Sequence, residues 1–317
     1  MRSSSASRGR PSRSSTARAH RASRAVLALA AVGLWLAPSR AHAYCRTTTC
    51  DPQTENCDPP AGSDCTTAGL PVYWPGLCVG YSLQRNASQQ VPFDTFQKVA
   101  DTSFSTWTQV DCGGGKPPTI ELSDMGPVTC DQPEYNQHSG NANIVMFRDT
   151  SWPYSNATNT LALTTVTFNT KTGEIYDVDM EINSWQTQLT TSDTGVHYDL
   201  QSIITHEAGH FLGLAHSSDP AATMYASYEP GTTTLRSLSP DDEAGICAVY
   251  PPDRSASTCD VTPRHGYQDT CGDTPPKPNS GCAVHAPDTE APGSAGLIAG
   301  IVSLVAFAAA RRRRQGA

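Results

Sequence analysis

Three histidines in the stretch from His206 to His216 set the strongest limit on the fold of this chain. His206 and His210 are four residues apart, so on a helix their imidazoles share one face and can reach one metal ion. Gly213 can adopt a positive φ, which would end the helix and return His216 toward the same metal. Three neutral imidazoles leave a fourth position open, as in catalytic zinc sites. We predict zinc bound by these histidines, with Glu207 as general base.

The complete string carries far more information than its parts. Two histidines four residues apart are common on helix surfaces and predict little. Three histidines, one glutamate and one glycine at these spacings arise by chance in about one of 10⁵ chains of this length at ordinary residue usage. The rival interpretation is a surface interaction protein that keeps zinc only for stability. Such a protein would be expected to lack a ligand or the base, and this sequence lacks neither.

The residues after His216 extend the pattern. Met224 lies eight residues downstream, and Ser217 follows the third histidine directly. With these residues the chain resembles the metzincin metalloproteases, in which the zinc-binding string precedes a methionine-containing turn beneath the metal. Ser217 and the run 238–246 (LSPDDEAGI) are similar to the matrixin family in particular. The resemblance covers residues 71–252, the expected catalytic domain.

The resemblance implies an α+β fold: a twisted, mostly parallel sheet with an antiparallel edge strand, an active-site helix and a C-terminal helix. It implies a zinc-dependent endopeptidase that hydrolyses peptide bonds in protein or peptide substrates. An extended substrate would add antiparallel to the edge strand near 161–165, so we expect Leu161, Ala162 and Leu163 to bind it. A specialised processing protease with a single partner is the alternative. The sequence leaves the substrate and the oligomeric state open.

Several positions depart from the family pattern. Tyr228 follows Ala-Ser where many matrixins have Pro-x-Tyr, so we expect it to line the S1′ pocket in a loop of undetermined course. Only His138 and His197 precede the motif in the mature region, and a second, structural zinc is not expected. No inhibitory segment of the matrixin type is present. Cys45 is a candidate zinc cap, although a disulfide is the preferred interpretation.

Two acidic groups have more than one interpretation. Asp241 and Asp242 begin the last predicted helix. In matrixins this position can pair with the N-terminal ammonium after activation, but acidic residues also stabilise the first turn of any helix, and we favour the second interpretation. Asp177, Asp179 and Glu181 alternate along a predicted strand. They are candidate calcium ligands, with a solvated strand face as the default.

The N-terminal end carries an export signal. Residues 1–24 are rich in Arg and Ser, residues 25–37 are an apolar run, and Ala41-His42-Ala43 offers small residues at positions −3 and −1. This pattern is typical of a signal peptide, here 1–43, that is cleaved before Tyr44. We therefore expect an exported protein, extracellular or at the cell surface.

The C-terminal end has a second targeting pattern. Residues 295–310 are apolar or small and precede four arginines, so that 295–317 resembles the sorting tail of bacterial, myxobacterial-type surface proteins. A membrane anchor is the alternative, although the run is short for a bilayer span. We expect contact with a membrane only through this tail, which either anchors the chain before processing or stays in place.

Charge and cysteine content describe the region between these ends. Of the 22 basic residues, eight precede Tyr44 and four follow Ala310, so ten remain with all 30 acidic residues and the formal charge is −20. Nucleic acid is therefore a poor partner. Eleven cysteines in an exported chain predict a disulfide framework, with ten for five bridges if Cys282 belongs to the tail. The pairing itself is open.

The spacing of apolar residues predicts the main elements. Residues 44–70 hold four cysteines and form a Cys-rich N-terminal segment, and 253–294 are expected to be a linker rich in Pro, Thr and Ser. Helices are predicted over 91–110, from Asp199 to Leu212 and from Ser239 to Tyr250. Short strands are predicted over 119–122, 143–148, 161–168 and 175–182, the last two as a hairpin.

Overall fold

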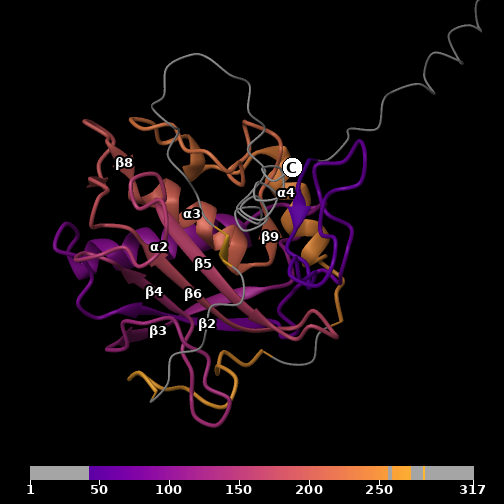
Figure 1. Cartoon of the computed structure of the whole chain (residues 1–317), viewed down its shortest axis with the longest axis horizontal. Coiled ribbons are helices and arrows are strands. Elements are labelled where there is room, and N and C mark those ends of the chain that lie inside the picture. Colours follow the sequence, from indigo (N-terminus) through magenta and orange to yellow (C-terminus); the bar gives the residue numbers. More distant parts are fainter. Residues whose placement is uncertain (1–42, 256–258, 273–280, 283–317) are drawn as a thin grey trace, which may run out of the picture. The chain divides into compact units, whose positions relative to one another are not determined.

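The computed structural model describes residues 43–255, 259–272 and 281–282 (Figure 1). Apart from Ala43, the expected signal peptide lies outside these residues, and so does the whole of the expected C-terminal tail, 295–317. Within the described part of the chain, no helix is both long enough and apolar enough to cross a membrane. Ala43 begins the compact unit that contains the sheet and the helices.

A six-stranded mixed sheet forms the centre of this unit. Its order is β10-β5-β6-β4-β2-β3, where β3, β2, β4 and β6 run parallel and β5 pairs antiparallel with β6. The expected α+β fold, with a mostly parallel sheet and an antiparallel strand toward one edge, is confirmed. The strands are β2 (Cys78–Gln84), β3 (Glu121–Val128), β4 (Ile144–Phe147), β5 (Ala162–Phe168), β6 (Ile175–Ile182) and β10 (Gly281–Cys282).

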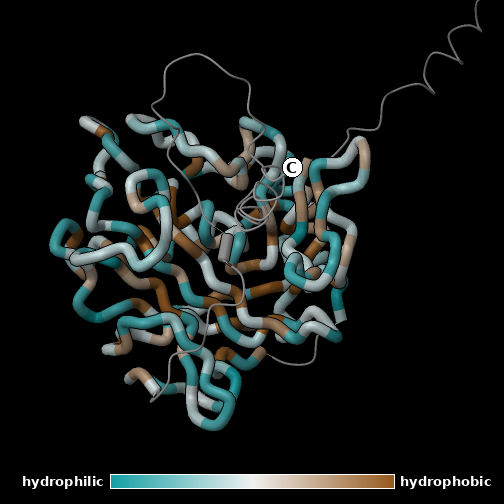
Figure 2. The backbone as a smooth tube through the Cα atoms, in the orientation of Figure 1, coloured by the Kyte–Doolittle hydropathy of each residue, from teal (hydrophilic) through white to brown (hydrophobic). Residues whose placement is uncertain are grey.

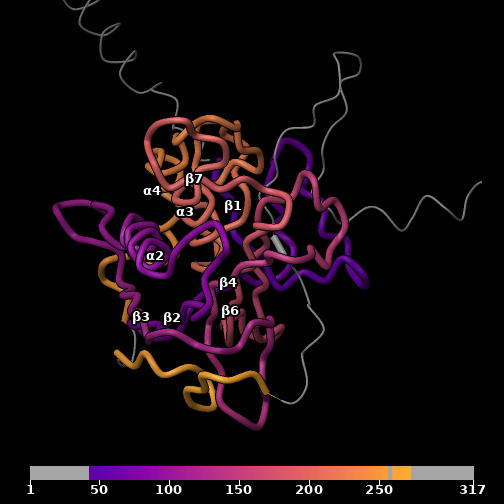
Figure 3. Tube along the Cα trace, turned by 90° about the vertical axis from the view of Figure 1, so that its left-hand side faces the viewer, coloured from indigo at the N-terminus to yellow at the C-terminus, as the bar shows by residue number. Residues whose placement is uncertain are grey.

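Two helices, α2 (Phe93–Thr108) and α3 (Leu200–Phe211), pack on one face of this sheet, and the segment 259–272 lies on the other side (Figure 3). A further helix, α4 (Pro240–Val249), lies beyond α3, away from the strands. The core lies between α2, α3 and the sheet, where apolar residues concentrate along the strands (Figure 2). Phe104 of α2 meets Phe211 of α3 edge-on, with ring centroids 5.2 Å apart. The burial of such aromatic faces holds α3 against α2.

Short elements complete the surroundings of α3. β1 (Cys45–Arg46) pairs antiparallel with β9 (Leu214–Ala215), which precedes His216 directly. β7 (Leu189–Thr190) pairs with β8 (Tyr198–Asp199), and β8 leads into α3. A 3-10 turn, η1 (Thr234–Arg236), packs near the start of α3. The two ends of the active-site helix are therefore fixed by separate small ladders.

Five disulfides join ten of the eleven cysteines. Two of them are local to the Cys-rich segment 44–70, and the other three close long loops across the sheet and the helices. Residues 259–272, which fall in the range expected as a linker, are fastened beneath the sheet by two of these long-range bridges. The pairs are Cys45–Cys65, Cys50–Cys57, Cys78–Cys259, Cys112–Cys247 and Cys130–Cys271.

Candidate metal centre and active site

The three motif histidines converge at the C-terminal part of α3. Their ring centroids lie 4.8 to 5.3 Å apart, and one nitrogen from each ring lies within 4.8 Å of the other two. His206 and His210 are fully buried on α3, and His216 is half-buried after β9. Three imidazole nitrogens at this separation suit a single small cation.

Main-chain carbonyls fix the orientation of two of these rings. His206 Nδ1 lies 2.6 Å from the carbonyl oxygen of Thr223, and His210 Nδ1 lies 2.9 Å from that of Leu214. Each Nδ1 can donate to its carbonyl, which leaves Nε2 unprotonated and directed to the common centre. Among the described residues, the buried Nε2 of His210 has no hydrogen-bond partner. The donor set therefore fits zinc.

Burial keeps His210 in the form that binds a metal. Desolvation, reinforced by the neighbouring His206, lowers the pKa of His210 to about 3. The imidazole is neutral at pH 7 and needs no deprotonation to act as a ligand.

Gly209 allows a methionine to pack beneath the histidines. A Cβ on Gly209 would collide with Met224 Sδ and would lie 2.8 Å from Cζ2 of Trp107. Met224 is buried, and the Trp107 ring is held in place because its Nε1 donates to the carbonyl of Thr205 at 2.7 Å. Glycine is needed at 209 because a side chain there would displace Met224 and Trp107. Gly213 is needed for its φ of +91°, which turns the chain after α3.

Asp242 organises the turn that contains Met224. Its carboxylate accepts the backbone N–H groups of Thr223 at 2.7 Å and Met224 at 3.0 Å, and that of Ser239 at 2.8 Å. Ser239 in turn caps α4, since its hydroxyl accepts the N–H of Asp242. One buried carboxylate thus joins the methionine turn to the start of α4. The sequence placed Asp242 in the first helical turn but gave no signal for this second role.

Asp241 binds a different pair of groups. Its carboxylate accepts the hydroxyl of Ser217 and the backbone N–H of Ala43, each at 2.7 Å. Asp242 therefore fits the helix-cap interpretation, whereas the partner of Asp241 is the peptide N–H of Ala43, the last residue of the expected signal peptide, so pairing with an N-terminal ammonium stays a prediction. Ser217 matters because it directly follows the third histidine, and its N–H also donates to the carbonyl of Met224 at 2.8 Å.

Thr164 contacts the expected general base. Its hydroxyl donates to Glu207 Oε2 at 2.5 Å, and both side chains are fully buried. Thr164 lies on β5, so this bond links the strand at the sheet edge to the helix that carries the histidines. The sequence marked 161–165 as a strand but did not single out Thr164, because a threonine in a β run is ordinary strand composition.

Comparison with known proteins places this constellation in a family. The family model described as Matrixin matches residues 74–251, more than half of the 317 residues. The chain belongs to the matrixin family. Neutrophil collagenase of Homo sapiens is 49% identical over 61 residues, which are 19% of this chain and 13% of that protein.

Two further matrixins show how local the sequence identity is. Metalloendoproteinase 1-MMP of Arabidopsis thaliana is 49% identical over 55 residues, 17% of this chain and 15% of its own length. Matrilysin of Homo sapiens is 52% identical over 46 residues, 14% of this chain and 17% of its own. The aligned parts cover 13 to 17% of these three relatives, well under two thirds of each.

The expected substrate-binding residues of this matrixin lie on or beside β5 and near the methionine turn. Leu161 and Ala162 are buried in the core, and Leu163 is half-buried. Tyr228 is also buried, with its hydroxyl donating to the carbonyl of Thr232 and accepting the N–H of Asp199. The side chains of Leu161, Ala162 and Tyr228 therefore offer almost no exposed surface, and their role in substrate binding stays a prediction.

The acidic residues on β6 are buried, in contrast to the solvated face taken as the default. Asp179 accepts the N–H groups of Glu134 and Ile144, and Glu181 binds Arg148 and the Tyr154 hydroxyl. Burial, together with the charge of Asp179, raises the pKa of Asp177 well above its usual range. Asp179 and Glu181 thus hold neighbouring loops against the sheet, and calcium binding by the three acidic residues stays a prediction.

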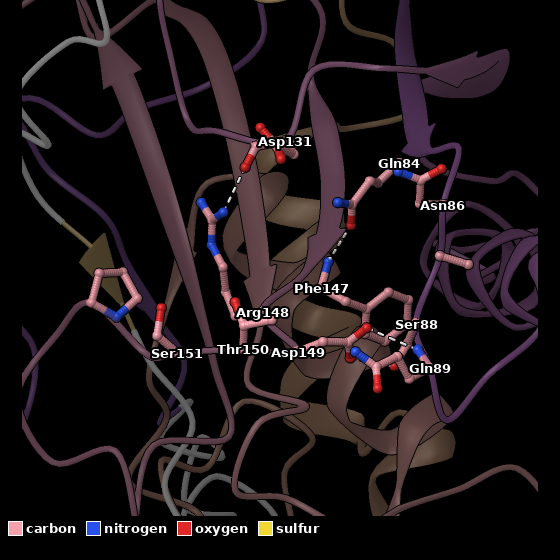
Figure 4. Close-up of a pocket in the computed structure, with 12 residues that line it drawn as sticks. Gln84, Asn86, Ser88, Gln89, Asp131, Phe147, Arg148, Asp149, Thr150 and Ser151 are labelled. Carbon is pink, nitrogen blue, oxygen red and sulfur yellow. Dashed lines mark hydrogen bonds between the residues drawn. The ribbon is translucent and has the colours of Figure 1, made fainter.

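Within the described part of the chain, two other candidate metal clusters and a pocket are weaker candidates for the functional site than the three histidines. Two clusters of Cys and Glu meet the spacing for a metal, but their cysteines are the disulfide pairs Cys78–Cys259 and Cys130–Cys271. A pocket at the carboxyl ends of β2 and β4 is lined by Gln84, Asp131, Arg148 and Asp149 among others (Figure 4). Arg148 there already binds Glu181 and the carbonyl of Asp131.

Proposed function

We propose that this matrixin is an exported zinc endopeptidase that hydrolyses peptide bonds in proteins. The observation that carries the proposal is the convergence of three metal-binding imidazoles with a buried glutamate between the first two in sequence. His206, His210 and His216 would hold the zinc. When bound, zinc supplies Lewis acidity toward a water molecule and toward the carbonyl oxygen of the scissile bond.

Side chains and main-chain groups of the protein transfer the proton and align the substrate. Glu207 takes a proton from the water at Oε1, the carboxylate oxygen that Thr164 does not bind, and returns it to the nitrogen of the leaving peptide. Thr164 holds the other oxygen. The outward main-chain groups of β5 align the substrate as an added antiparallel strand. This arrangement orients water, base and peptide bond before reaction, which lowers the entropic part of the activation barrier.

Export to an oxidising compartment is part of the proposal. Five disulfides support it, because such bridges persist in secreted proteins and are rare in reducing compartments. The signal peptide 1–43 and the sorting or anchoring tail 295–317 would direct the chain there. Fractionation of cells that produce the chain, with antibodies to the catalytic domain, would place it outside the cytoplasm if this is correct.

The decisive experiment compares the exported chain with its Glu207→Gln variant on casein and on a quenched-fluorescence peptide library. We expect the parent chain to cleave both substrates and a zinc chelator to abolish this cleavage. The rate of cleavage by the variant should be lower by a factor of about 10³ or more, since general-base catalysis and water orientation are lost together. Metal analysis is the control: the variant should keep one zinc per chain. Full activity of the variant, or activity indifferent to the chelator, would contradict the proposal.

A further inference from the structure

The outer edge of β5 is occupied by another part of the same chain. β6 pairs along one side of β5, and β10 pairs antiparallel along the other, with Gly281 opposite Thr165 and Cys282 opposite Thr164. β10 is a two-residue strand at the yellow end of the colour scale in Figure 1. Without it, the β5 edge would expose unpaired N–H and C=O groups, and such an edge readily accepts a further strand.

This pairing lies beside the reaction centre. Thr164, whose backbone is opposite Cys282, is also the residue whose hydroxyl donates to Glu207 at 2.5 Å. The proposed function requires a substrate to pair antiparallel with this same edge. Each outward N–H and C=O of β5 can be satisfied by only one added strand, so β10 and a substrate cannot occupy Thr164 and Thr165 together.

We propose that the segment containing Gly281 and Cys282 is a built-in competitor of the substrate, docked on the β5 edge and released before peptides can bind. The proposal rests on the proposed function, because it names the regulation of that same site. Its basis is main-chain pairing. The segment therefore occupies the edge as an extended backbone, and a substrate would pair with β5 through the same main-chain groups.

The attachment of the segment makes this competition effective. Cys271 is tied to Cys130 by a disulfide, so the chain is anchored ten residues before Gly281. Ten residues reach at most about 33–36 Å when extended. A tether this short gives an effective concentration of the order of millimolar, so even a weak two-residue ladder can exclude micromolar substrate. Cutting the tether would remove this advantage.

The test uses the full chain with the recognition sequence of an unrelated, specific protease inserted between Pro276 and Lys277. Cleavage after folding would free the segment that contains β10. We expect the apparent KM for a peptide substrate to fall about tenfold while kcat stays constant, which is the signature of a lost competitor. A matched chain carries the same insertion after Pro292, where cleavage removes the downstream tail but leaves β10 tethered. The kinetics of this control should not change.

A second measurement does not depend on activity. Hydrogen exchange in the Glu207→Ala background, which cannot digest itself, reports whether the β5 edge is covered. We expect backbone amides in 161–168 to exchange faster after cleavage at the first insertion than after cleavage at the second. Equal exchange in both chains would overturn the docking proposal. If exchange differs but no chain cleaves any peptide, the docking stands and the proposed proteolysis fails.

Discussion

At the scale of single residues, Thr164 is a side chain outside the motif that binds the proposed base, Glu207. A carboxylate beside a metal can rotate, and only some orientations place an oxygen toward the water. The bond from Thr164 Oγ1 to Glu207 Oε2, between two fully buried groups, favours orientations that keep Oε2 toward β5. Hydrogen bonds to charged groups contribute about 1.5–3 kcal/mol, enough to matter for a rate.

We predict that Thr164→Val lowers kcat by about 10- to 100-fold with little change in KM. The lost hydrogen bond is worth about 1.5–3 kcal/mol, and an energy of that size corresponds to such a change in rate. Thr164→Ser should restore most of the rate, since it keeps the hydroxyl. Thr167→Val is the matched control on the same strand and should behave like the parent. Steady-state kinetics on a peptide substrate measure all three; a KM effect without a kcat effect would show that Thr164 acts in binding instead.

At the scale of elements, the fit between α3 and the methionine turn rests on a missing side chain. Gly209 lies in the middle of α3, where alanine would be a better helix former by about 1 kcal/mol. Its Cβ would overlap Met224 Sδ and press on the ring of Trp107, which is hydrogen-bonded to Thr205. Overpacking of a filled core costs about 1–3 kcal/mol, so the contact outweighs the propensity.

We therefore predict that Gly209→Ala lowers stability by up to about 2 kcal/mol and weakens zinc binding, because the turn beneath the histidines must move. Gly245→Ala in α4 is the matched control. Its Cβ would meet only side-chain atoms of Tyr44 and Leu214, at 3.2 and 3.3 Å, which can yield slightly. Denaturant unfolding with and without chelator separates the two effects. A stabilising Gly209→Ala would contradict this account of the packing.

At the scale of the whole molecule, disulfides that close long loops hold the sheet and the helices together. Cys78–Cys259 spans 181 residues, whereas Cys50–Cys57 spans 7. A bridge stabilises mainly by restricting the unfolded chain, more for longer loops. Cys112–Cys247 already shortens the loop that Cys78–Cys259 closes. This shortening reduces the difference in stabilisation between Cys78–Cys259 and Cys50–Cys57.

We predict that the double variant Cys78→Ser/Cys259→Ser loses about 2 kcal/mol more stability than Cys50→Ser/Cys57→Ser, as expected from the ratio of the loop lengths. Denaturant unfolding of the oxidised variants measures the difference, and a free-thiol assay confirms that the other four pairs have formed. Equal losses in both variants would show that native contacts, and not loop closure, carry the effect.

Much of this molecule was predictable from local patterns. The helix from Asp199, the hairpin of β5 and β6, and the cap at Ser239 are confirmed, because each has a periodicity or a capping residue of its own. β2 was missed. It is buried along its whole length, so it lacks the alternation that marks a half-exposed strand.

The remaining gaps concern contacts between distant parts of the chain. The bond between Thr164 and Glu207, the three N–H groups bound by Asp242 and the disulfide pairing join residues far apart in sequence. No spacing rule reports such contacts, since they depend on how elements pack. The convergence of the three histidines was predictable because two lie on one helix and the third follows a single turn.

The disulfide pattern also implies an order in time. In the proposed export, Cys45–Cys65 and Cys50–Cys57 can close as soon as the first part of the chain has crossed the membrane, whereas Cys247, Cys259 and Cys271 follow α3 in the sequence. All three long bridges must therefore wait until the three histidines and Glu207 have also crossed. The oxidation of the last cysteines is then the step that completes the covalent framework around the candidate metal site.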